Sequence, residues 1–352
     1  MRVPSAPFAV AGLFMLVGAP VLAAQSGTYP IHGDDIAIYN LAGLLRVEPA
    51  TGSDVVVVVQ TGGSDAGKLK VATGVARGHD GLRVIYPEDV IVYPTLGRHS
   101  NTTMDVNDDG TFGTNRDEDE GHRVRVRGDG SGLEAWADLT VKVPAGRTVS
   151  MHVGVGKATV TNVDGQIKVA VGSSDVSATG VKGTIGLVTG SGDIHVTDAT
   201  AELKLETGSG DVTMSRVTDS GVKVETGSGD VTGDNVSTGK LALSSGSGSI
   251  TVSTVQAARI SLETGSGDVD IGLVSGIETL EGNTGSGTIT LSVPATLGAD
   301  VELDTGSGEI DLGGVEVKVR KLRSDHLSGS IGNGGGTIKL EAGSGDINLR
   351  KS

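Results

Sequence analysis

Apolar and polar residues alternate in short runs along the second half of the chain, and these runs recur. Residues 203–207 read Leu-Lys-Leu-Glu-Thr and residues 222–226 read Val-Lys-Val-Glu-Thr. Alternation with a period of two puts the apolar side chains on one face and the charged ones on the other, which is typical of a half-buried β-strand. The pattern therefore predicts many short strands, each of which buries one face.

Each run leads into a variant of Thr-Gly-Ser-Gly-Asp-Val. Clear copies span residues 189–194, 207–212, 226–231, 264–269, 305–310 and 342–347, and looser copies span 171–176, 245–250, 284–289 and 327–331. From Gly172 to Gly306 the first glycines of successive copies lie 18 to 21 residues apart. A steady period of this length is typical of stacked coils, with one supersecondary unit per repeat.

The repeats predict both the corner and the fold class. We expect Gly-Ser-Gly to form a corner between two strands, because glycine reaches the positive φ angles that a sharp bend needs. The rest of a coil, such as residues 215–220, is expected to be a variable loop that supplies one apolar residue, Val217. The predicted fold is all-β: a β-solenoid of coils of about 19 residues, taken as a right-handed β-helix although the sequence does not set the hand.

Composition agrees with a narrow interior. Glycine accounts for 57 of the 352 residues, and aromatic residues make up only 2% of the chain, so a bulky aromatic core is excluded. Disorder is excluded because the aliphatic residues are plentiful and periodic. The chain has no cysteine, which excludes disulfides, thiolate metal sites and a cysteine nucleophile.

The amino terminus predicts export. Met1-Arg2 precedes an apolar run at residues 8–17, and small residues end at Ala23-Ala24. This order is typical of a secretory signal peptide, here residues 1–24, and the apolar run is too short to span a bilayer. We expect the mature chain to be exported to the periplasm or the extracellular space, with no transmembrane segment after signal removal.

The mature chain is expected to have two parts. Residues 25–150 form an irregular β-rich N-terminal part, which holds the first coils as a cap and a hydrophilic loop at 95–121. Residues 151–352 form the regular solenoid. Gly33 and Gly52 lie 19 residues apart and open similar sequences, so the first coil is expected to begin near residue 30.

Several segments of the chain carry a family resemblance. Tyr-Asn-Leu-Ala-Gly at 39–43, Asp-Gly-Thr-Phe-Gly at 109–113, Ala-Trp-Ala-Asp-Leu at 135–139 with Val-Pro-Ala-Gly at 143–146, and the Gly-Ser-Gly-Asp series resemble the bacterial putative-adhesin family of β-strand-repeat proteins. The resemblance covers nearly the whole mature chain. It implies an exported β-helix with a proposed adhesive role, and it supplies no catalytic residues to carry over.

The repeated corner residues are predicted to be structural. The Asp position holds Ser249, Thr288, Glu309 or Ser330 in other copies. A calcium ladder would tolerate these exchanges poorly, whereas Asp, Ser and Thr all bond to backbone N–H groups of turns. A calcium ladder therefore stays the alternative. The predicted turn residues are Gly190, Gly192, Asp193, Gly208, Gly210, Asp211, Gly227, Gly229, Asp230, Gly265, Gly267, Asp268, Gly343, Gly345 and Asp346.

One acidic segment is a weak calcium candidate. Asp105, Asn107 and Asp109, followed by Gly110, match the opening of an EF-hand loop, in which alternate oxygens wrap the ion. The twelfth position is Arg116, where a bidentate Glu is needed. A solvated turn is therefore the preferred interpretation, and we expect no other cofactor.

Enzymatic motifs are scarce. The seven histidines show no zinc-type spacing, and the acidic residues occur about once per coil. Asp193 with His195 and Asp325 with His326 are the close acid and histidine neighbours along the chain, without a hydrolase context. We predict a protein that is not an enzyme. The alternative is a polysaccharide lyase or hydrolase, which would need two carboxylates and a base in one groove.

Charge narrows the choice of partner. The formal net charge of −15 disfavours nucleic acid and anionic membranes through long-range repulsion. Arg123, Arg125 and Arg127 alternate with valines, either as neighbours of the acidic loop or as a docking patch for an anionic glycan. The predicted function is a non-catalytic, adhesin-like interaction protein that binds a glycan, an envelope component or a protein along its strand faces. A purely structural envelope spacer is a further alternative.

Overall fold

The computed structural model describes residues 22–23, 26–113 and 121–352, and within these residues the fold is all-β. One large mixed sheet contains 26 strands and a separate sheet contains four. Two short 3₁₀ turns, Ala66–Lys68 and Pro94–Leu96, are the helical elements of the described residues. No helix in this part of the chain is long and apolar enough to cross a membrane.

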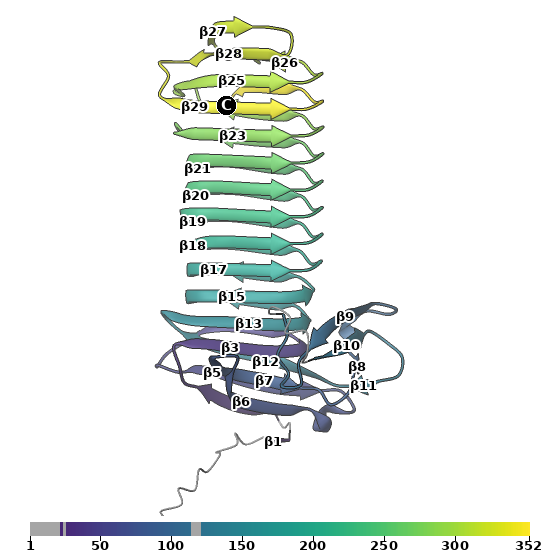
Figure 1. The fold of residues 1–352 in the computed structure, drawn as a ribbon. Coiled ribbons are helices and arrows are strands. Elements are labelled where there is room, and N and C mark those ends of the chain that lie inside the picture. Colours follow the sequence, from purple (N-terminus) through teal and green to yellow (C-terminus); the bar gives the residue numbers. More distant parts are fainter. Residues whose placement is uncertain (1–21, 24–25, 114–120) are drawn as a thin grey trace, which may run out of the picture.

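Most strands lie in an elongated stack, which runs from the base to the top of the molecule in Figure 1. The stack contains β3 (Asp35–Ala42), β4 (Leu45–Ala50), β13 (Arg147–Val155), β14 (Ala158–Thr161), β15 (Asp164–Ser173), β16 (Val176–Thr179), β17 (Lys182–Thr189), β18 (Ile194–Thr207), β19 (Val212–Thr226), β20 (Val231–Ser245), β21 (Ile250–Thr264), β22 (Val269–Leu273), β23 (Thr279–Thr284), β24 (Ile289–Val293), β25 (Ala299–Thr305), β26 (Ile310–Asp311), β27 (Val317–Leu322), β28 (His326–Ile331), β29 (Gly336–Ala342) and β30 (Ile347–Lys351).

One repeat of the stack, here called a rung, has three sides. In β19 these are residues 212–215, residues 217–219 and residues 222–226, which we name the first, second and third sides. All three pair in parallel with the next repeat in β20. Residues 215–220, expected to form a variable loop, therefore belong to a continuous strand, in which Val217 is fully buried and pairs with Val236.

The interior of the stack is built from aliphatic ladders. Val212, Val217 and Val224 are fully buried, whereas Lys223 between them is exposed. Complete burial of one such side chain stabilises the fold by about 1.5–3 kcal/mol. Repetition of this gain in every rung explains how a chain with few aromatic residues holds its shape.

A column of left-handed residues marks the bend between the first and second sides. It consists of Asn162, Gly180, Asp198, Arg216, Asn235 and Thr254, whose φ angles lie between 53° and 67°. Glycine, Asn and Asp tolerate this region best, and a β-branched residue such as Thr254 adopts it at a cost. The positive-φ corner of the rung is therefore here, five residues after the Asp position of the Gly-Ser-Gly-Asp segment.

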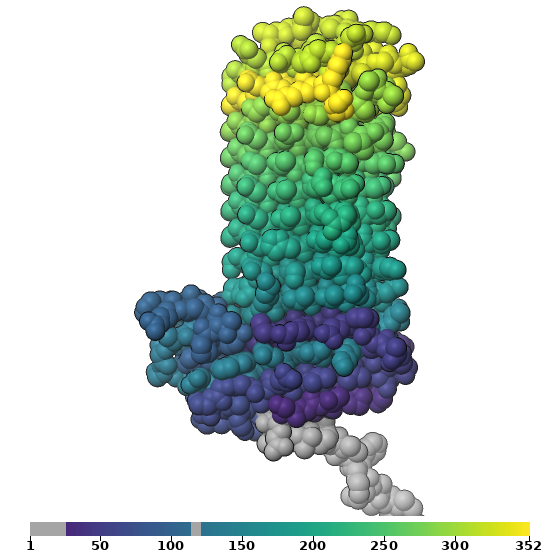
Figure 2. All heavy atoms as spheres, turned by 180° about the vertical axis from the view of Figure 1, so that it is seen from behind, coloured from purple at the N-terminus to yellow at the C-terminus, as the bar shows by residue number. Residues whose placement is uncertain are grey.

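The C-terminal strands are inserted into the stack rather than added at its end. β29 pairs in parallel with β23 on one side and with β25 on the other. In Figure 1 the yellow β29 accordingly lies between the green β23 and β25, and Figure 2 shows yellow atoms of the C-terminal residues among green ones from behind. Beyond β25 the pairing becomes antiparallel, first with β28 and then from β28 to β27. Residues 327–331, expected to form a corner with Ser330 at the Asp position, lie within β28, so that prediction is wrong.

The base of the stack is irregular. β3 pairs in parallel with β13 and β4 with β14, so the first rung begins at Asp35. The chain leaves the stack after β4 and re-enters it at β13. The intervening segment supplies β5 (Val55–Gly62), β6 (Lys70–Ala76), β7 (His79–Ile85) and β12 (Trp136–Pro144), and β1 (Leu22–Ala23) and β2 (Gly27–Ile31) join them. Antiparallel pairs such as β12 with β5 close this end of the stack.

The small sheet projects from the side of the base (Figures 1 and 2). It consists of β8 (Val90–Val92), β9 (Asn101–Val106), β10 (His122–Arg127) and β11 (Leu133–Glu134). β9 pairs with β10 in antiparallel register. The hydrophilic loop expected at 95–121 is therefore in part a strand. Residues 114–120 of that loop, and the predicted signal peptide apart from Leu22–Ala23, lie outside the described residues.

Candidate functional site

The threonine of each Gly-Ser-Gly-Asp corner ties neighbouring rungs together. Thr226 Oγ1 donates a hydrogen bond to the carbonyl of Gly210 in the preceding rung, at 3.1 Å, and accepts one from the N–H of Gly229, also at 3.1 Å. The residue is buried. The same two bonds recur at Thr189, Thr207, Ser245, Thr264, Thr284 and Thr305.

The corner glycines are required by close approach and not by their φ angles. A Cβ on Gly208 would lie 2.3 Å from the carbonyl oxygen of Gly190, and one on Gly210 would lie 2.0 Å from that of Gly192. None of the predicted turn glycines has a φ angle in the left-handed region. The expectation of positive φ at Gly-Ser-Gly is therefore wrong, because the constraint comes from the rung below.

The corner aspartates form a ladder of hydrogen bonds along one edge. The N–H of Asp211 donates to Asp193 Oδ1 at 2.9 Å, and the N–H of Asp230 donates to Asp211 Oδ1 at 2.8 Å. Ser249 continues the series, since its Oγ accepts from the N–H of Asp268 at 3.2 Å. Each side chain thus serves the backbone of the next rung, a role that a hydroxyl fills as well as a carboxylate does.

The acidic segment near the small sheet forms a tight hydrogen-bonded turn. Asp109 Oδ1 accepts hydrogen bonds from the N–H and the hydroxyl of Thr111, at 2.9 and 2.7 Å. The Asn107 side-chain amide donates to the carbonyl oxygen of Thr111. Asp109 Oδ2 lies 3.5 Å from Arg83. Partial burial raises the pKa of Asp109, but the bonds from Thr111 and the nearby arginines outweigh it and lower the pKa below its ordinary value. Both carboxylate oxygens of Asp109 are thus engaged, one within the turn and one with Arg83.

The other members of that neighbourhood lie on the small sheet. Asp105 is at the end of β9, where its carboxylate is 3.7 Å from Arg123 on β10. Arg127 bonds to the carbonyl of Asp129 at 2.5 Å. The arginines of β10 are therefore partly engaged with nearby acidic and backbone oxygens.

The third side carries polar side chains outward in two columns, which become acidic toward the distal end, at the top of Figure 1. In β21, β23, β29 and β25 the first column holds Ser261, Glu281, Lys339 and Glu302, and the second holds Glu263, Asn283, Glu341 and Asp304. We name these eight residues the distal polar face. Because β29 is inserted between β23 and β25, its lysine and glutamate join residues that are distant in sequence.

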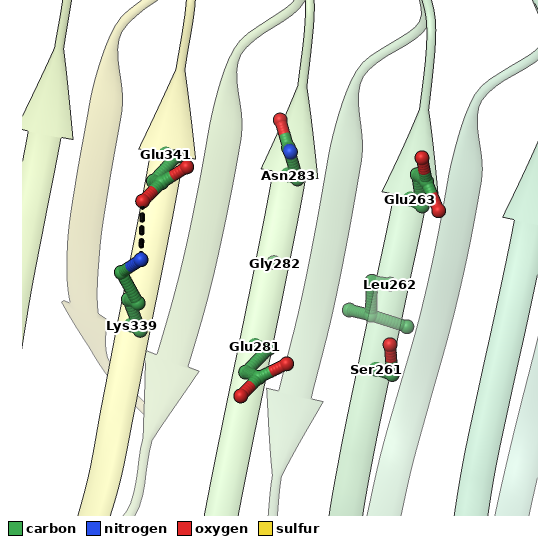
Figure 3. A pocket seen from close by; sticks show the side chains of 8 residues that line it. All are labelled: Ser261, Leu262, Glu263, Glu281, Gly282, Asn283, Lys339 and Glu341. Atoms are coloured by element: carbon green, nitrogen blue, oxygen red, sulfur yellow. Dashed lines mark ion pairs between the residues drawn. The ribbon is translucent and has the colours of Figure 1, made fainter.

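Part of the distal polar face is hollowed. A surface depression of about 260 Å³ is lined by Ser261, Leu262, Glu263, Glu281, Gly282, Asn283, Lys339 and Glu341. Figure 3 shows the polar side chains projecting from three neighbouring strands, with an ion pair between Lys339 and Glu341. Their Nζ and Oε1 atoms are 2.5 Å apart. The hydrogen bond and the charge of Glu341 raise the pKa of Lys339, so the amine is held in its protonated form.

Beyond the hollow, a histidine joins the distal polar face. His326 on β28 lies opposite Asp304 on β25, and its Nδ1 is 2.6 Å from Asp304 Oδ1. Glu302, two residues from Asp304, completes a group whose ligand atoms all lie within 4.8 Å of one another. The sequence pointed instead to Asp325 as the neighbour of His326. The antiparallel pairing of β28 with β25 places Asp304 next to His326 instead. The local sequence pattern does not predict this pairing.

The stacked strands and repeated glycine corners define an all-β repeat protein. The model of the Toastrack DUF4097 family matches residues 97–350, so the chain belongs to this family. The resemblance to β-strand-repeat proteins is thereby confirmed. A solved structure of a putative cell adhesion protein from Clostridium sporogenes ATCC 15579 is similar at 12% identity, over 93% of this chain and 100% of that chain, with a TM-score of 0.22. A likeness this low carries no functional argument. No curated protein matches the chain.

Proposed function

We propose that the chain is an exported, non-catalytic interaction protein, and that its stack is a right-handed β-solenoid that presents polar faces to a partner. The fold proposal rests on parallel, in-register pairing between successive rungs. Right-handed crossovers between parallel strands are strongly preferred. Export rests on the predicted signal peptide at residues 1–24.

The observation that carries the binding proposal is the hollow on the distal polar face. Its carboxylates, the Asn283 amide and the Ser261 hydroxyl accept hydrogen bonds, and Lys339 and Asn283 donate them. This mixture suits a ligand rich in hydroxyl groups. Three carboxylates against one ammonium group repel an anionic chain. We therefore propose a neutral or amine-bearing glycan of the envelope as the partner.

The protonation of Lys339 argues against a lyase that would use this amine as its base. A polysaccharide-cleaving site needs a pair of carboxylates or an acid with a free base in one groove. The hollow does contain several carboxylates, but its amine has a raised pKa and is paired with Glu341. An amine in that state cannot accept a proton near neutral pH. Lys339 is therefore not the free base that a lyase needs, and cleavage by a pair of the carboxylates is tested by the release of shortened sugars.

Capture of envelope glycans and proteins on the immobilised full-length chain tests this proposal, with and without a calcium chelator. We expect a neutral or amine-bearing glycan to be retained by the wild type. A variant that combines Glu281→Gln and Glu341→Gln should retain at least about tenfold less, which corresponds to a loss of about 1.4 kcal/mol of binding free energy.

The matched control combines Glu206→Gln and Glu225→Gln, which remove two carboxylates from the second column of the third side near the middle of the stack. This control should bind as the wild type does. Retention of no glycan or protein in either condition would leave only a structural spacer. Release of shortened sugar products from the captured glycan would favour the enzyme instead.

A further inference from the structure

We propose that Glu302, Asp304 and His326 form a binding site for a divalent transition metal of the zinc class. The three side chains come from β25 and β28 at the distal end of the stack. Glu302 and Asp304 lie beside Lys339 and Glu341 of the hollow but do not line it, and the metal site is tested without a glycan.

The backbone places the three ligands on one surface. Glu302 and Asp304 are two residues apart on one strand, and side chains at that spacing point to the same face. The antiparallel register of β25 and β28 sets His326 directly opposite Asp304 and Ser328 opposite Glu302. The His326 side chain is only 15% exposed. The imidazole is therefore fixed by packing, while the carboxylate of Glu302 remains free to move toward an ion.

Charge at this position also favours a cation. Elsewhere on the third side, a lysine in the first column neutralises the glutamate of the second: Lys204 with Glu206, Lys223 with Glu225 and Lys339 with Glu341 all pair at 2.5–2.7 Å. In β25 the lysine position is taken by Glu302. Two carboxylates therefore stand side by side where β18, β19 and β29 each place an ion pair.

The donor set selects the kind of metal. One imidazole nitrogen with two carboxylate oxygens suits zinc and similar transition metals, which accept mixed nitrogen and oxygen ligands. Calcium and magnesium prefer oxygen ligands alone. Two ligands of one ion lie farther apart than the 2.6 Å between His326 Nδ1 and Asp304 Oδ1, so metal binding must open this hydrogen bond while Glu302 moves closer. Three protein ligands leave one tetrahedral position for water or for a group of a partner.

Titration of the metal-free full-length chain with Zn²⁺ by calorimetry tests the site, and Co²⁺ absorption reports its geometry. We expect one tight equivalent and a tetrahedral Co²⁺ spectrum with visible bands. His326→Gln and, separately, Glu302→Gln should weaken this equivalent by at least about tenfold, because loss even of a supporting residue weakens metal sites by about 10- to 100-fold. Glu302 is exposed, so its exchange leaves the fold intact.

The matched control is His195→Gln. His195 is an exposed histidine on β18 that lies between Ser177 and Thr213 in the neighbouring strands. This variant should bind Zn²⁺ as the wild type does. Absence of a tight equivalent in the wild type, or equal affinity in the wild type and Glu302→Gln, would overturn the proposal.

Discussion

At the scale of single residues, the corner threonine illustrates how a small polar group supports a whole stack. The hydroxyl of Thr226 donates a hydrogen bond to the carbonyl of Gly210 and accepts one from the N–H of Gly229. The Thr226 side chain is buried. Ser245 fills the same position with the same bonds, while Ala342 in the inserted rung has no hydroxyl. The stack thus tolerates loss of the methyl group at Ser245, and it also holds Val171 at the threonine position without a hydroxyl.

Thr226→Val should lower the free energy of unfolding by about 2–6 kcal/mol, because two buried backbone groups lose their partner at about 1–3 kcal/mol each. Thr226→Ser keeps the hydroxyl and should cost less than about 1 kcal/mol, the value of one buried methyl group. Chemical denaturation monitored by circular dichroism checks both variants. Equal destabilisation by Val and Ser would contradict the role of the hydroxyl.

His152 on β13 is a buried histidine. Its ring stacks on Tyr39 at 4.6 Å and meets the edge of Phe112, so it joins the first rungs to the turn beside the small sheet. Its Nδ1 is buried and has no hydrogen-bond partner within the described part of the chain. Burial, with smaller contributions from Lys168 and His79, lowers the pKa of His152 to about 4. The folded state therefore resists protonation.

Stability should fall as the pH is lowered from about 7 to 4, because the unfolded chain takes up a proton on His152 near its ordinary pKa of about 6.5 whereas the folded chain does not. The loss from this residue approaches about 3 kcal/mol. His152→Phe preserves the stacking and should flatten the pH dependence in this window. Chemical denaturation of both proteins at pH 7, 5.5 and 4.5 measures the free energy of unfolding at each pH. The His195→Gln variant, at an exposed position, serves as the control. Parallel pH profiles for wild type and His152→Phe would refute this.

At the scale of elements, β27 shows how the stack is terminated. It is the last strand beyond β28, and Val319 and Leu322 on it are 46% and 67% exposed. An open strand edge with exposed apolar residues invites pairing with another molecule. Lys318, Arg320 and Lys321 interrupt the apolar pattern of the same strand. The positive charges keep two such ends apart.

Replacement of Lys318 and Lys321 by threonine should promote association of the stack through its distal end, because threonine favours strand pairing and removes the repulsion. Light scattering after size-exclusion chromatography should show a molar mass that rises with protein concentration. The control replaces Lys204 and Lys223, which lie on the side of the stack, and should elute as the wild type does. A wild-type profile for the β27 variant would show that the charges do not guard this edge.

At the scale of the whole molecule, the insertion of the C-terminal rung changes what the end of the chain does. In a simple stack the last rung can be removed without disturbing the others. Here β29 fills the space between β23 and β25, and Ile338, Leu340, Ile347 and Leu349 of this rung are fully buried. The C-terminus therefore fastens the distal end to the rest of the stack.

Truncation after Gly335 should unfold the distal end and leave the middle rungs intact. The four buried aliphatic residues together contribute on the order of 6–12 kcal/mol, which is comparable with the total stability of a typical domain. Hydrogen exchange should show loss of protection across residues 279–331, while residues 182–264 stay protected. Unchanged protection of β25 in the truncated chain would mean that it pairs directly with β23.

The alternation of apolar residues and the period of the corners can be recognised in the sequence alone, because both patterns are local and repeat many times. That information predicts the all-β class and the ladders of Val, Ile and Leu. The loop expected at 215–220 and the corner expected at 327–331 are wrong because burial of Val217 and the antiparallel path of β28 depend on neighbouring rungs. The corner glycines are required, as predicted, but for a different reason, since the clash lies with the rung below and not in the corner's own φ angles.

The sequence by itself determined the repeating unit of this protein, since a strand with one apolar face followed by a glycine corner is encoded within about 20 residues. Only the tertiary structure decided the order of the rungs at the distal end. Every rung presents nearly the same aliphatic face, so the ladders accept β29 after β23 as readily as they would accept β25. The distal polar face and the group of Glu302, Asp304 and His326 follow from that order, because they join side chains whose proximity is set by pairing between strands and not by their spacing along the chain.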